Sequence, residues 1–274
     1  MLGAFFLWRE IGKRGGMGAL SAAVLPVGAV MCVAVILRQV EIVLGVMFGV
    51  VAVHLAVLAL LVISSRQRAV GADGIITGCW MLCGLVACLV AGQHGVMGRF
   101  GGLGLLCAGL VVIVQMFNRP KNLSHVALGM VRWWLVLLAV MGVVSGAWLM
   151  VRRTETISVL LNLSTGIFSQ VVLAPWSGLC ALLGIRYQGK WQVKEVCTGL
   201  IWGNAVLVTA GLGLTALCLG TVHIAQKLLS VTLPWVSALL VLAVVGIYLP
   251  AKTARWWGGL LLILLVGYGL SLLW

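Results

Sequence analysis

The residues best suited to chemistry are a few polar side chains at the ends of long apolar runs. The stretch VAGQHGVMGRF, residues 90–100, places His94 and Arg99 five residues apart among glycines, and His223 ends a later apolar run. Histidine can exchange protons near neutral pH, and arginine keeps a charge that stabilises a developing anion. With Arg152, this set has what quinol oxidation needs, which is a hydrogen-bond partner for the hydroxyl, a proton acceptor and an exit to water.

These residues could lie at one level of a membrane. His94 and His223 both fall at the predicted outer ends of helices, and the same level would hold further polar residues, namely Gln93, Arg99, Arg152, Arg153, Glu155 and Gln226. The alternative is that they are ordinary interfacial residues whose polar tips reach water. The constellation alone does not decide between the two.

The elements that must position these groups are membrane-spanning helices. The chain of 274 residues is 63% hydrophobic and only 8% charged, whereas soluble domains carry about 25% charged residues. Because a span needs roughly 20 apolar residues, the sequence predicts an all-α, polytopic membrane bundle of about nine helices, with eight possible. The expected spans are 18–37, 42–63, 74–93, 101–117, 133–151, 158–185, 198–221, 231–250 and 256–274, the sixth being tilted or broken near Pro175.

Basic residues predict the orientation of this bundle. Residues 1–17 mix aromatic and basic side chains and suit a short interfacial segment, followed by the transmembrane bundle over 18–274. With the N-terminus in the cytoplasm, the outer segments hold five of the 18 basic residues, which are Arg38, Arg99, Arg152, Arg153 and Lys227. The other thirteen fall in cytoplasmic segments, so the positive-inside rule predicts a cytoplasmic N-terminus and an outer C-terminus.

Ionisable groups and cysteines limit the chemistry inside the bundle. All five acidic residues fall at predicted helix ends or in loops, so a carboxylate proton relay at membrane depth is not expected. His54 is the one histidine deep inside a span, and a haem would need a second at its level, so we interpret His54 as a packed residue hydrogen-bonded to a neighbouring helix. The eight cysteines lack metal-ligand spacing, and we expect no intrinsic haem or metal.

Part of the chain resembles the membrane anchor subunit of bacterial dimethyl sulfoxide reductase, mainly over residues 131–250. MVRWWLVLLAVMGVVSGAWLMVRRTETISVLL is similar to that family's fourth helix and following loop, and FSQVVLAPWSGLCALLGI to its next helix. LGTVHIAQKLL carries His223 in a similar Thr-x-His segment. QHGVMGRF resembles a shortened form of the family's menaquinol-binding segment, without its proline.

The resemblance implies a membrane anchor subunit of a respiratory molybdoenzyme in the bacterial cytoplasmic (inner) membrane. Such a subunit binds and oxidises menaquinol and passes electrons to an iron–sulfur subunit, which feeds a molybdopterin catalytic subunit. His94, Arg99, His223 and Arg152 would then bind the quinol, with His94 as the preferred proton acceptor. Whether the chain would count as an enzyme by itself is left open.

Two other functions fit the composition. A transporter or permease component is favoured by the helical bundle and its 36 glycines, and the lack of deep charges then indicates a neutral or lipid-like substrate. A membrane scaffolding protein without a catalytic site is the third.

Overall fold

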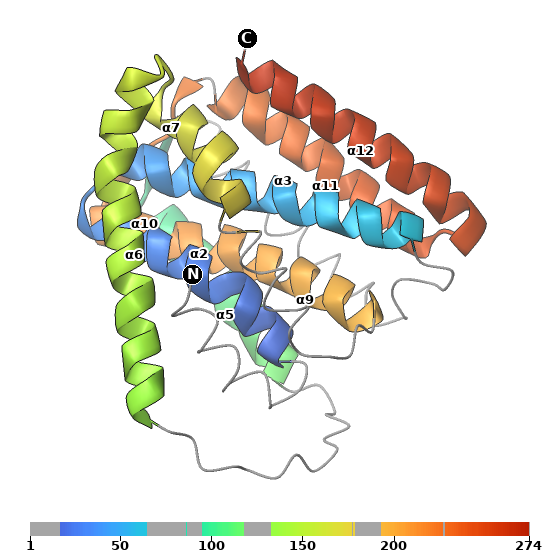
Figure 1. Cartoon of the computed structure of the whole chain (residues 1–274), viewed down its shortest axis with the longest axis horizontal. Coiled ribbons are helices and arrows are strands. Elements are labelled where there is room, and N and C mark those ends of the chain that lie inside the picture. Colours follow the sequence, from blue (N-terminus) through green and yellow to red (C-terminus); the bar gives the residue numbers. More distant parts are fainter. Residues whose placement is uncertain are drawn as a thin grey trace.

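The structure is a bundle of long helices with one short two-stranded ladder (Figure 1). It is a computed structural model that describes residues 17–64, 86, 95–117, 133–176, 178, 193–226 and 228–273. The elements in chain order are α2 (Met17–Ile36), α3 (Val40–Ser64), β1 (Val96–Gly98), α5 (Arg99–Phe117), α6 (Trp133–Leu160), α7 (Thr165–Phe168), η2 (Ser169–Leu173), α9 (Val193–Val206), η3 (Leu207–Gly211), α10 (Leu212–Leu219), β2 (Thr221–His223), η4 (Leu228–Thr232), α11 (Leu233–Tyr248) and α12 (Ala251–Leu273).

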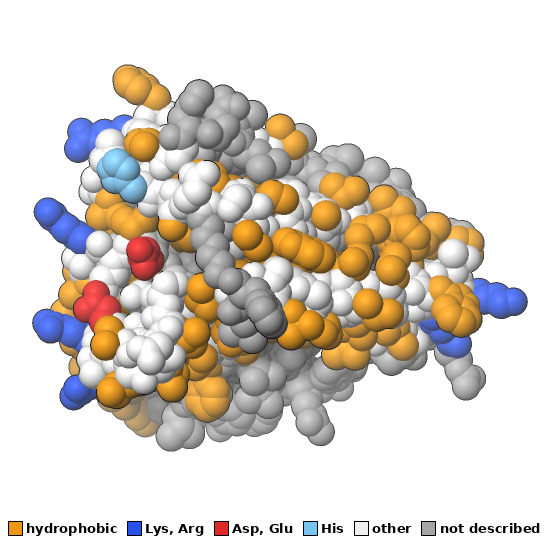
Figure 2. Space-filling view, turned by 90° about the horizontal axis from the view of Figure 1, so that it is seen from above, with side chains coloured by type: hydrophobic (Ala, Val, Ile, Leu, Met, Phe, Trp, Pro, Cys, Tyr) orange, Lys and Arg blue, Asp and Glu red, His pale blue; other side chains and the backbone are white. Residues whose placement is uncertain are grey.

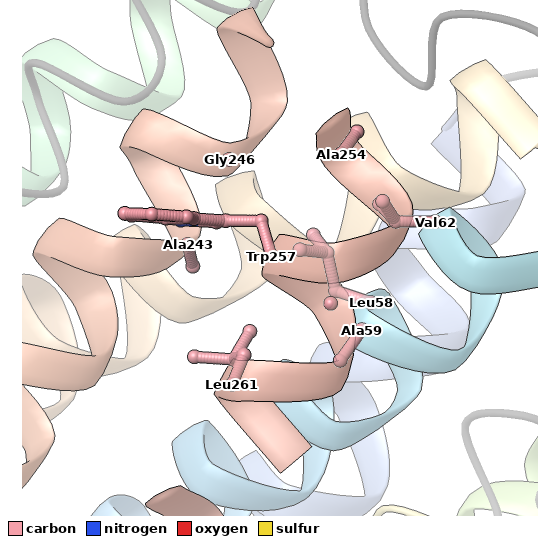
Figure 3. Close-up of a pocket in the computed structure, with 9 residues that line it drawn as sticks. Leu58, Ala59, Val62, Ala243, Gly246, Ala254, Trp257 and Leu261 are labelled. Carbon is pink, nitrogen blue, oxygen red and sulfur yellow. The ribbon is translucent and has the colours of Figure 1, made fainter. Parts of the chain in front are cut away.

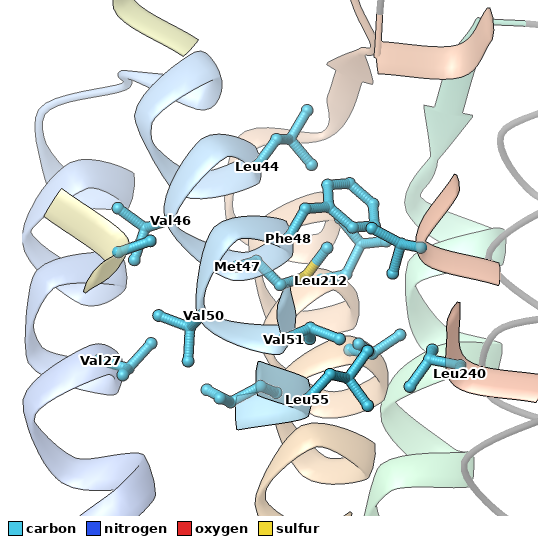
Figure 4. Close-up of a cluster of buried hydrophobic side chains, with 14 of the residues drawn as sticks. Val27, Leu44, Val46, Met47, Phe48, Val50, Val51, Leu55, Leu212 and Leu240 are labelled. Atoms are coloured by element: carbon cyan, nitrogen blue, oxygen red, sulfur yellow. The ribbon is translucent and has the colours of Figure 1, made fainter. Parts of the chain in front are cut away.

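Helix α3 runs through the centre of the bundle. It is in contact with α2, α9, α11 and α12, and residues 42–51 of this helix are all buried. Figure 4 shows its side chains, among them Phe48 and Leu55, turned toward Val27 on one side and toward Leu212 and Leu240 on others. A helix that is apolar on all faces is typically buried among other elements. Helix α3 is apolar in this way, and its four neighbouring helices cover it.

The bundle is a multi-pass membrane protein, as the composition predicted. Within the described residues, five helical segments are long and apolar enough to cross a membrane, and two shorter apolar helices accompany them. The segments are Val40–Ile63, Leu137–Leu160, Gly199–Leu219, Leu228–Gly246 and Lys252–Leu272, with Pro26–Ile36 and Arg99–Gln115 as the shorter pair. The predicted span 74–93, apart from Val86, and the interfacial segment 1–17, apart from Met17, lie outside the described residues, so the count of nine stays a prediction.

Charged side chains separate to the two ends of the bundle. Gly258 of α12 packs against Ala59 and Ile63, near the end of α3, which places Lys252 at that end, whereas Arg38 immediately precedes the start of α3. Figure 2 shows Lys and Arg at both ends of this face, with hydrophobic side chains between them. The opposite placement of Arg38 and Lys252 agrees with the predicted division of basic residues between two sides.

Two predicted boundaries are wrong. The fifth helix was expected to end at residue 151, but α6 continues to Leu160, so that Arg152 and Glu155 are helical and not in a loop. Figure 1 shows α6, which has 28 residues, running crosswise to α3, α11 and α12. The next helix begins only at Thr165, where the Ser164 side chain accepts a hydrogen bond from the amide of Ile167 at 3.3 Å.

In the part of the chain that the structure describes, three helices contain a π-helical turn, a wider turn that often marks functional positions. The turns η2 and η4 each end two residues before a proline, Pro175 and Pro234. Because proline has no N–H and its ring clashes with the carbonyl four residues earlier, the preceding turn must deform. The predicted irregularity near Pro175 is therefore confirmed as a widened turn. In each π-turn a hydroxyl also bonds to the carbonyl four residues back, from Ser169, Thr209 and Ser230, which favours bending.

Candidate functional site

The short ladder joins two of the segments that the sequence analysis selected. Val96 pairs with His223 and Gly98 with Thr221 in antiparallel register, and the amide of Ile224 donates to the carbonyl of Gly95 at 2.9 Å. The segment that begins α5 and the segment that follows α10 therefore lie side by side. The sequence could predict that both are helix ends, but only the fold brings them together.

Arg99 follows β1 and His223 ends β2, so the antiparallel register places these two residues at opposite ends of the ladder. Arg152 makes a different contact. The Arg99 guanidinium lies against Gly220, where a Cβ would be 3.3 Å from its nitrogens. His223 is exposed on β2. The Arg152 guanidinium stacks over the ring of Trp148 on its own helix, 5.4 Å from the ring centroid. His94 lies outside the described residues, so the predicted four-residue set is placed only in part.

A neighbouring contact ties α6 to the turn before α3. The amide nitrogen of Gln39 donates to a carboxylate oxygen of Glu155 at 2.6 Å. Arg99, Arg152 and Glu155 are all exposed. An exposed set of this kind agrees with the interfacial alternative.

The buried polar chemistry lies elsewhere, in the middle of the bundle. His54 of α3 is 1% exposed and Asn204 of α9 is 2% exposed, and the imidazole Nδ1 lies 2.7 Å from the side-chain oxygen of Asn204. Because an amide oxygen only accepts hydrogen bonds, Nδ1 carries the proton and donates. The prediction that His54 is hydrogen-bonded to a neighbouring helix is confirmed.

This arrangement leaves one strong acceptor without a hydrogen-bond partner in the part of the chain that the structure describes. With the proton on Nδ1, the Nε2 atom of His54 carries a lone pair, and it finds no hydrogen-bond partner among the described residues. A buried acceptor of this kind costs free energy unless a donor reaches it. The pair therefore can do two things, which are to hold two helices together and to receive a hydrogen bond from a third molecule.

The chain around Asn204 is irregular for local reasons. Asn204 follows Gly203 and lies three residues before the start of the π-turn η3, in which the Thr209 hydroxyl bonds to the carbonyl of Ala205 at 2.6 Å. The widened turn begins within one turn of Asn204. Sequence reasoning missed Asn204, although an asparagine in the middle of the apolar run 198–221 was a signal that could have selected it.

The described core around the pair is electrically neutral. Its buried polar side chains are His54, Thr154, Ser158, Ser169, Gln170, Asn204, Thr209, Thr215 and Thr232, with no carboxylate, lysine or arginine among the described ones. No group of three or more His, Cys, Asp or Glu residues occurs within the described part of the chain. The absence of intrinsic haem and metal stays a prediction.

A small apolar cavity of about 10 Å³ lies between α3, α11 and α12, lined by Leu58, Ala243, Trp257 and Leu261 among others (Figure 3). A site needs about 10–15 Å³ and polar partners to hold one water molecule, so this cavity has no binding role.

Comparison with solved structures finds a chain of similar fold. The chain superimposes on the crystal structure of the H+/Ca2+ exchanger CAX with a TM-score of 0.68, over 99% of this chain and 83% of the exchanger, at 17% sequence identity. The two chains share one fold. No protein-family model and no curated protein matches the sequence.

This shared fold corrects the interpretation as a respiratory anchor. A fold held in common with the exchanger over nearly the whole chain contradicts membership of the dimethyl sulfoxide reductase anchor family, and with it the oxidation of menaquinol in anaerobic respiration. The same finding contradicts the prediction of iron–sulfur and molybdopterin partner subunits. The matched positions were mostly Leu, Val and Gly, which any apolar helix supplies, so the resemblance reflected composition.

Proposed function

We propose that the chain is a membrane transporter for a neutral, hydrogen-bonding solute, and that His54 and Asn204 contact the solute on its path. The observation that carries this proposal is the buried pair itself, whose His54 Nε2 has no hydrogen-bond partner among the described residues. The likeness in fold to an exchanger supports transport as the general activity.

The chemistry of the pair favours a neutral cargo. Ca²⁺ takes 6–8 oxygen ligands, commonly from carboxylates, whereas the described core offers neutral amide, hydroxyl and imidazole groups. A charge at this depth would lack a compensating partner among these groups. A solute with an N–H or O–H can instead donate to His54 Nε2 without such a cost.

The test is solute flux through the full chain reconstituted in liposomes. Acetamide and glycerol are the neutral probes, and Ca²⁺ uptake driven by a pH gradient is the comparison. We expect flux of a neutral probe above protein-free liposomes, with a loss of at least about fivefold in His54→Leu, the size of one hydrogen bond. Ca²⁺ uptake that survives in the protein while neither neutral probe moves would contradict the proposal.

A matched control separates transport from folding. Thr154→Val removes a buried hydroxyl whose partner among the described residues is the Met150 carbonyl of its own helix, so its flux should equal that of the unmodified protein. Equal losses in Thr154→Val and His54→Leu would show a general packing defect and remove the support for His54.

A lipid-like cargo is the second candidate. An open, shallow apolar hollow of about 590 Å³ lies on one face of α6, and the residues that line it all come from this helix, namely Val140, Met141, Val144, Ser145, Trp148 and Leu149. Its size and apolar lining suit an acyl chain. Transfer of a fluorescent lipid between leaflets that His54→Leu leaves unchanged would favour this candidate over the first.

A further inference from the structure

A second group of buried polar side chains lies outside the His54–Asn204 pair. Gln170 of η2, Thr232 at the end of η4 and Tyr268 of α12 are 5%, 1% and 3% exposed. The Gln170 amide nitrogen donates to the Thr232 hydroxyl at 3.5 Å, and the Tyr268 hydroxyl faces that same hydroxyl. Three segments far apart in the sequence thus bring four polar atoms to one place.

These atoms are poorly satisfied by one another. A distance of 3.5 Å is at the upper limit for a hydrogen bond. The Gln170 amide oxygen and the Tyr268 hydroxyl have no well-formed partner among the described residues. Buried polar groups that are left unpaired in this way are commonly bridged by an ordered water molecule, whose place a polar ligand group can take.

The backbone places these side chains by a repeated device. Gln170 lies in one π-turn and Thr232 ends another, and each turn is followed after two residues by a proline. Each proline widens the preceding turn, and π-turns recur at functional sites. Both polar residues therefore come from the deformed turns and not from regular helix.

The group is separate from the first pair, although α3 touches both. A Cβ at Gly49 would lie 2.7 Å from the Gln170 carbonyl oxygen. His54 is five residues further along α3, or about 7.5 Å at the helical rise. The second group is thus displaced along the bundle toward the beginning of α3.

The donors and acceptors define the ligand. The Gln170 oxygen only accepts and therefore requires an N–H or O–H, whereas the Tyr268 hydroxyl can donate to an oxygen. The Trp235 ring lies beside Tyr268, with centroids 6.5 Å apart, and supplies an apolar wall. No described charged side chain is buried in the core to compensate an ion.

We propose that Gln170, Thr232 and Tyr268 form a second binding site, for a neutral group that both donates and accepts hydrogen bonds, such as a primary amide or a hydroxyl. Because this site and His54 lie at different positions along the length of the bundle, we assign it as a second binding site for the same solute on its path. This assignment rests on the proposed transport function, but binding can be measured without transport.

The experiment is ligand-observed saturation-transfer NMR on the full chain in detergent. Acetamide is the probe, and acetate and ethylammonium are charged probes of similar size. We expect acetamide alone to receive saturation, and its affinity to fall at least about fivefold in Tyr268→Phe and in Gln170→Leu, the equivalent of one hydrogen bond each. Tyr268→Phe removes one oxygen atom and keeps the ring contact with Trp235.

Controls make each outcome decisive. Thr154→Val should bind acetamide as the unmodified protein does, and Thr232→Val gives a third site variant if Gln170→Leu fails to fold. Acetamide binding that is unchanged in all site variants, absent binding of acetamide, or equal binding of acetate would each overturn the site. Binding that depends on Tyr268 but comes without acetamide flux in liposomes would leave the site standing and contradict the transport function.

Discussion

The imidazole of His54 and the amide of Asn204, 150 residues apart in sequence, meet 2.7 Å from each other in the apolar core. Hydrogen bonds between membrane helices contribute about 0.6 kcal/mol on average and up to about 1.7 kcal/mol. The contact joins α3 to α9, and it determines which way the imidazole turns its free nitrogen.

Replacing either partner should reveal this coupling. His54→Leu leaves the Asn204 oxygen without its hydrogen bond, and Asn204→Leu leaves the His54 N–H without its hydrogen bond. Each variant should therefore lose about 1–3 kcal/mol of unfolding free energy. The double variant leaves neither group unpaired, and its loss should be smaller than the sum of the two. Unfolding in mixed micelles measures all four proteins, and strictly additive losses would show that the two side chains do not interact.

Trp257 should contribute more to the free energy of unfolding than the adjacent Trp256 does. Its indole N–H donates to the Leu242 carbonyl at 2.7 Å and ties α12 to α11, whereas Trp256 is 81% exposed. Trp257→Phe should cost about 1–2 kcal/mol through the lost hydrogen bond and contact, and Trp256→Phe less than about 0.5 kcal/mol. Thermal unfolding in detergent compares them, and equal midpoints would refute the expected difference.

Gly49 should tolerate no side chain, because η2 packs directly on it. A Cβ there would lie within 3 Å of the Gln170 backbone, and small residues permit such close helix approach in membranes. Gly49→Val should therefore reduce the yield of folded protein and displace Gln170. Gly146→Val is the control, since a Cβ at Gly146 meets nothing within 4 Å. Size-exclusion profiles report the outcome, and two equally monodisperse proteins would contradict the packing.

The β1–β2 register can be tested by cross-linking. Val96 and His223 are directly paired and both exposed, and directly opposed strand residues have Cβ atoms about 4.5–5.5 Å apart. In a background without the natural cysteines, Val96→Cys with His223→Cys should form a disulfide under mild oxidation. Val96→Cys with Thr221→Cys is displaced by two residues and should react far less. Comparable cross-linking of both pairs, seen as gel mobility shifts, would rule out this register.

The predicted orientation of the bundle can be measured by labelling single cysteines from one side. Arg38→Cys should react with an impermeant thiol reagent added outside intact cells, because the positive-inside rule assigns Arg38 to the outer side. Lys252→Cys, at the opposite end of the bundle, should react only after permeabilisation. The reverse pattern would show that the N-terminus lies outside.

Most of the architecture followed from hydrophobic patterning. Runs such as 42–63 and 256–274 predicted the helices Val40–Ser64 and Ala251–Leu273 within a few residues, because a membrane span has to satisfy its own backbone. The same reasoning ended α6 too early. Arg152 and Glu155 lie in a helix that crosses the others and reaches the polar end of the bundle, so charge did not mark the end of that helix.

The sequence by itself determined that the chain is an all-α membrane bundle, that His54 needs a partner on another helix, and that Pro175 disturbs its own helix. Each of these depends on local properties, namely the cost of exposing apolar residues, of burying an unpaired imidazole and of losing a backbone N–H. Only the tertiary structure decided that the partner of His54 is Asn204, and that Gln170, Thr232 and Tyr268 meet. Which helices become neighbours depends on the combined packing of many similar apolar faces, and no single stretch of sequence carries that information.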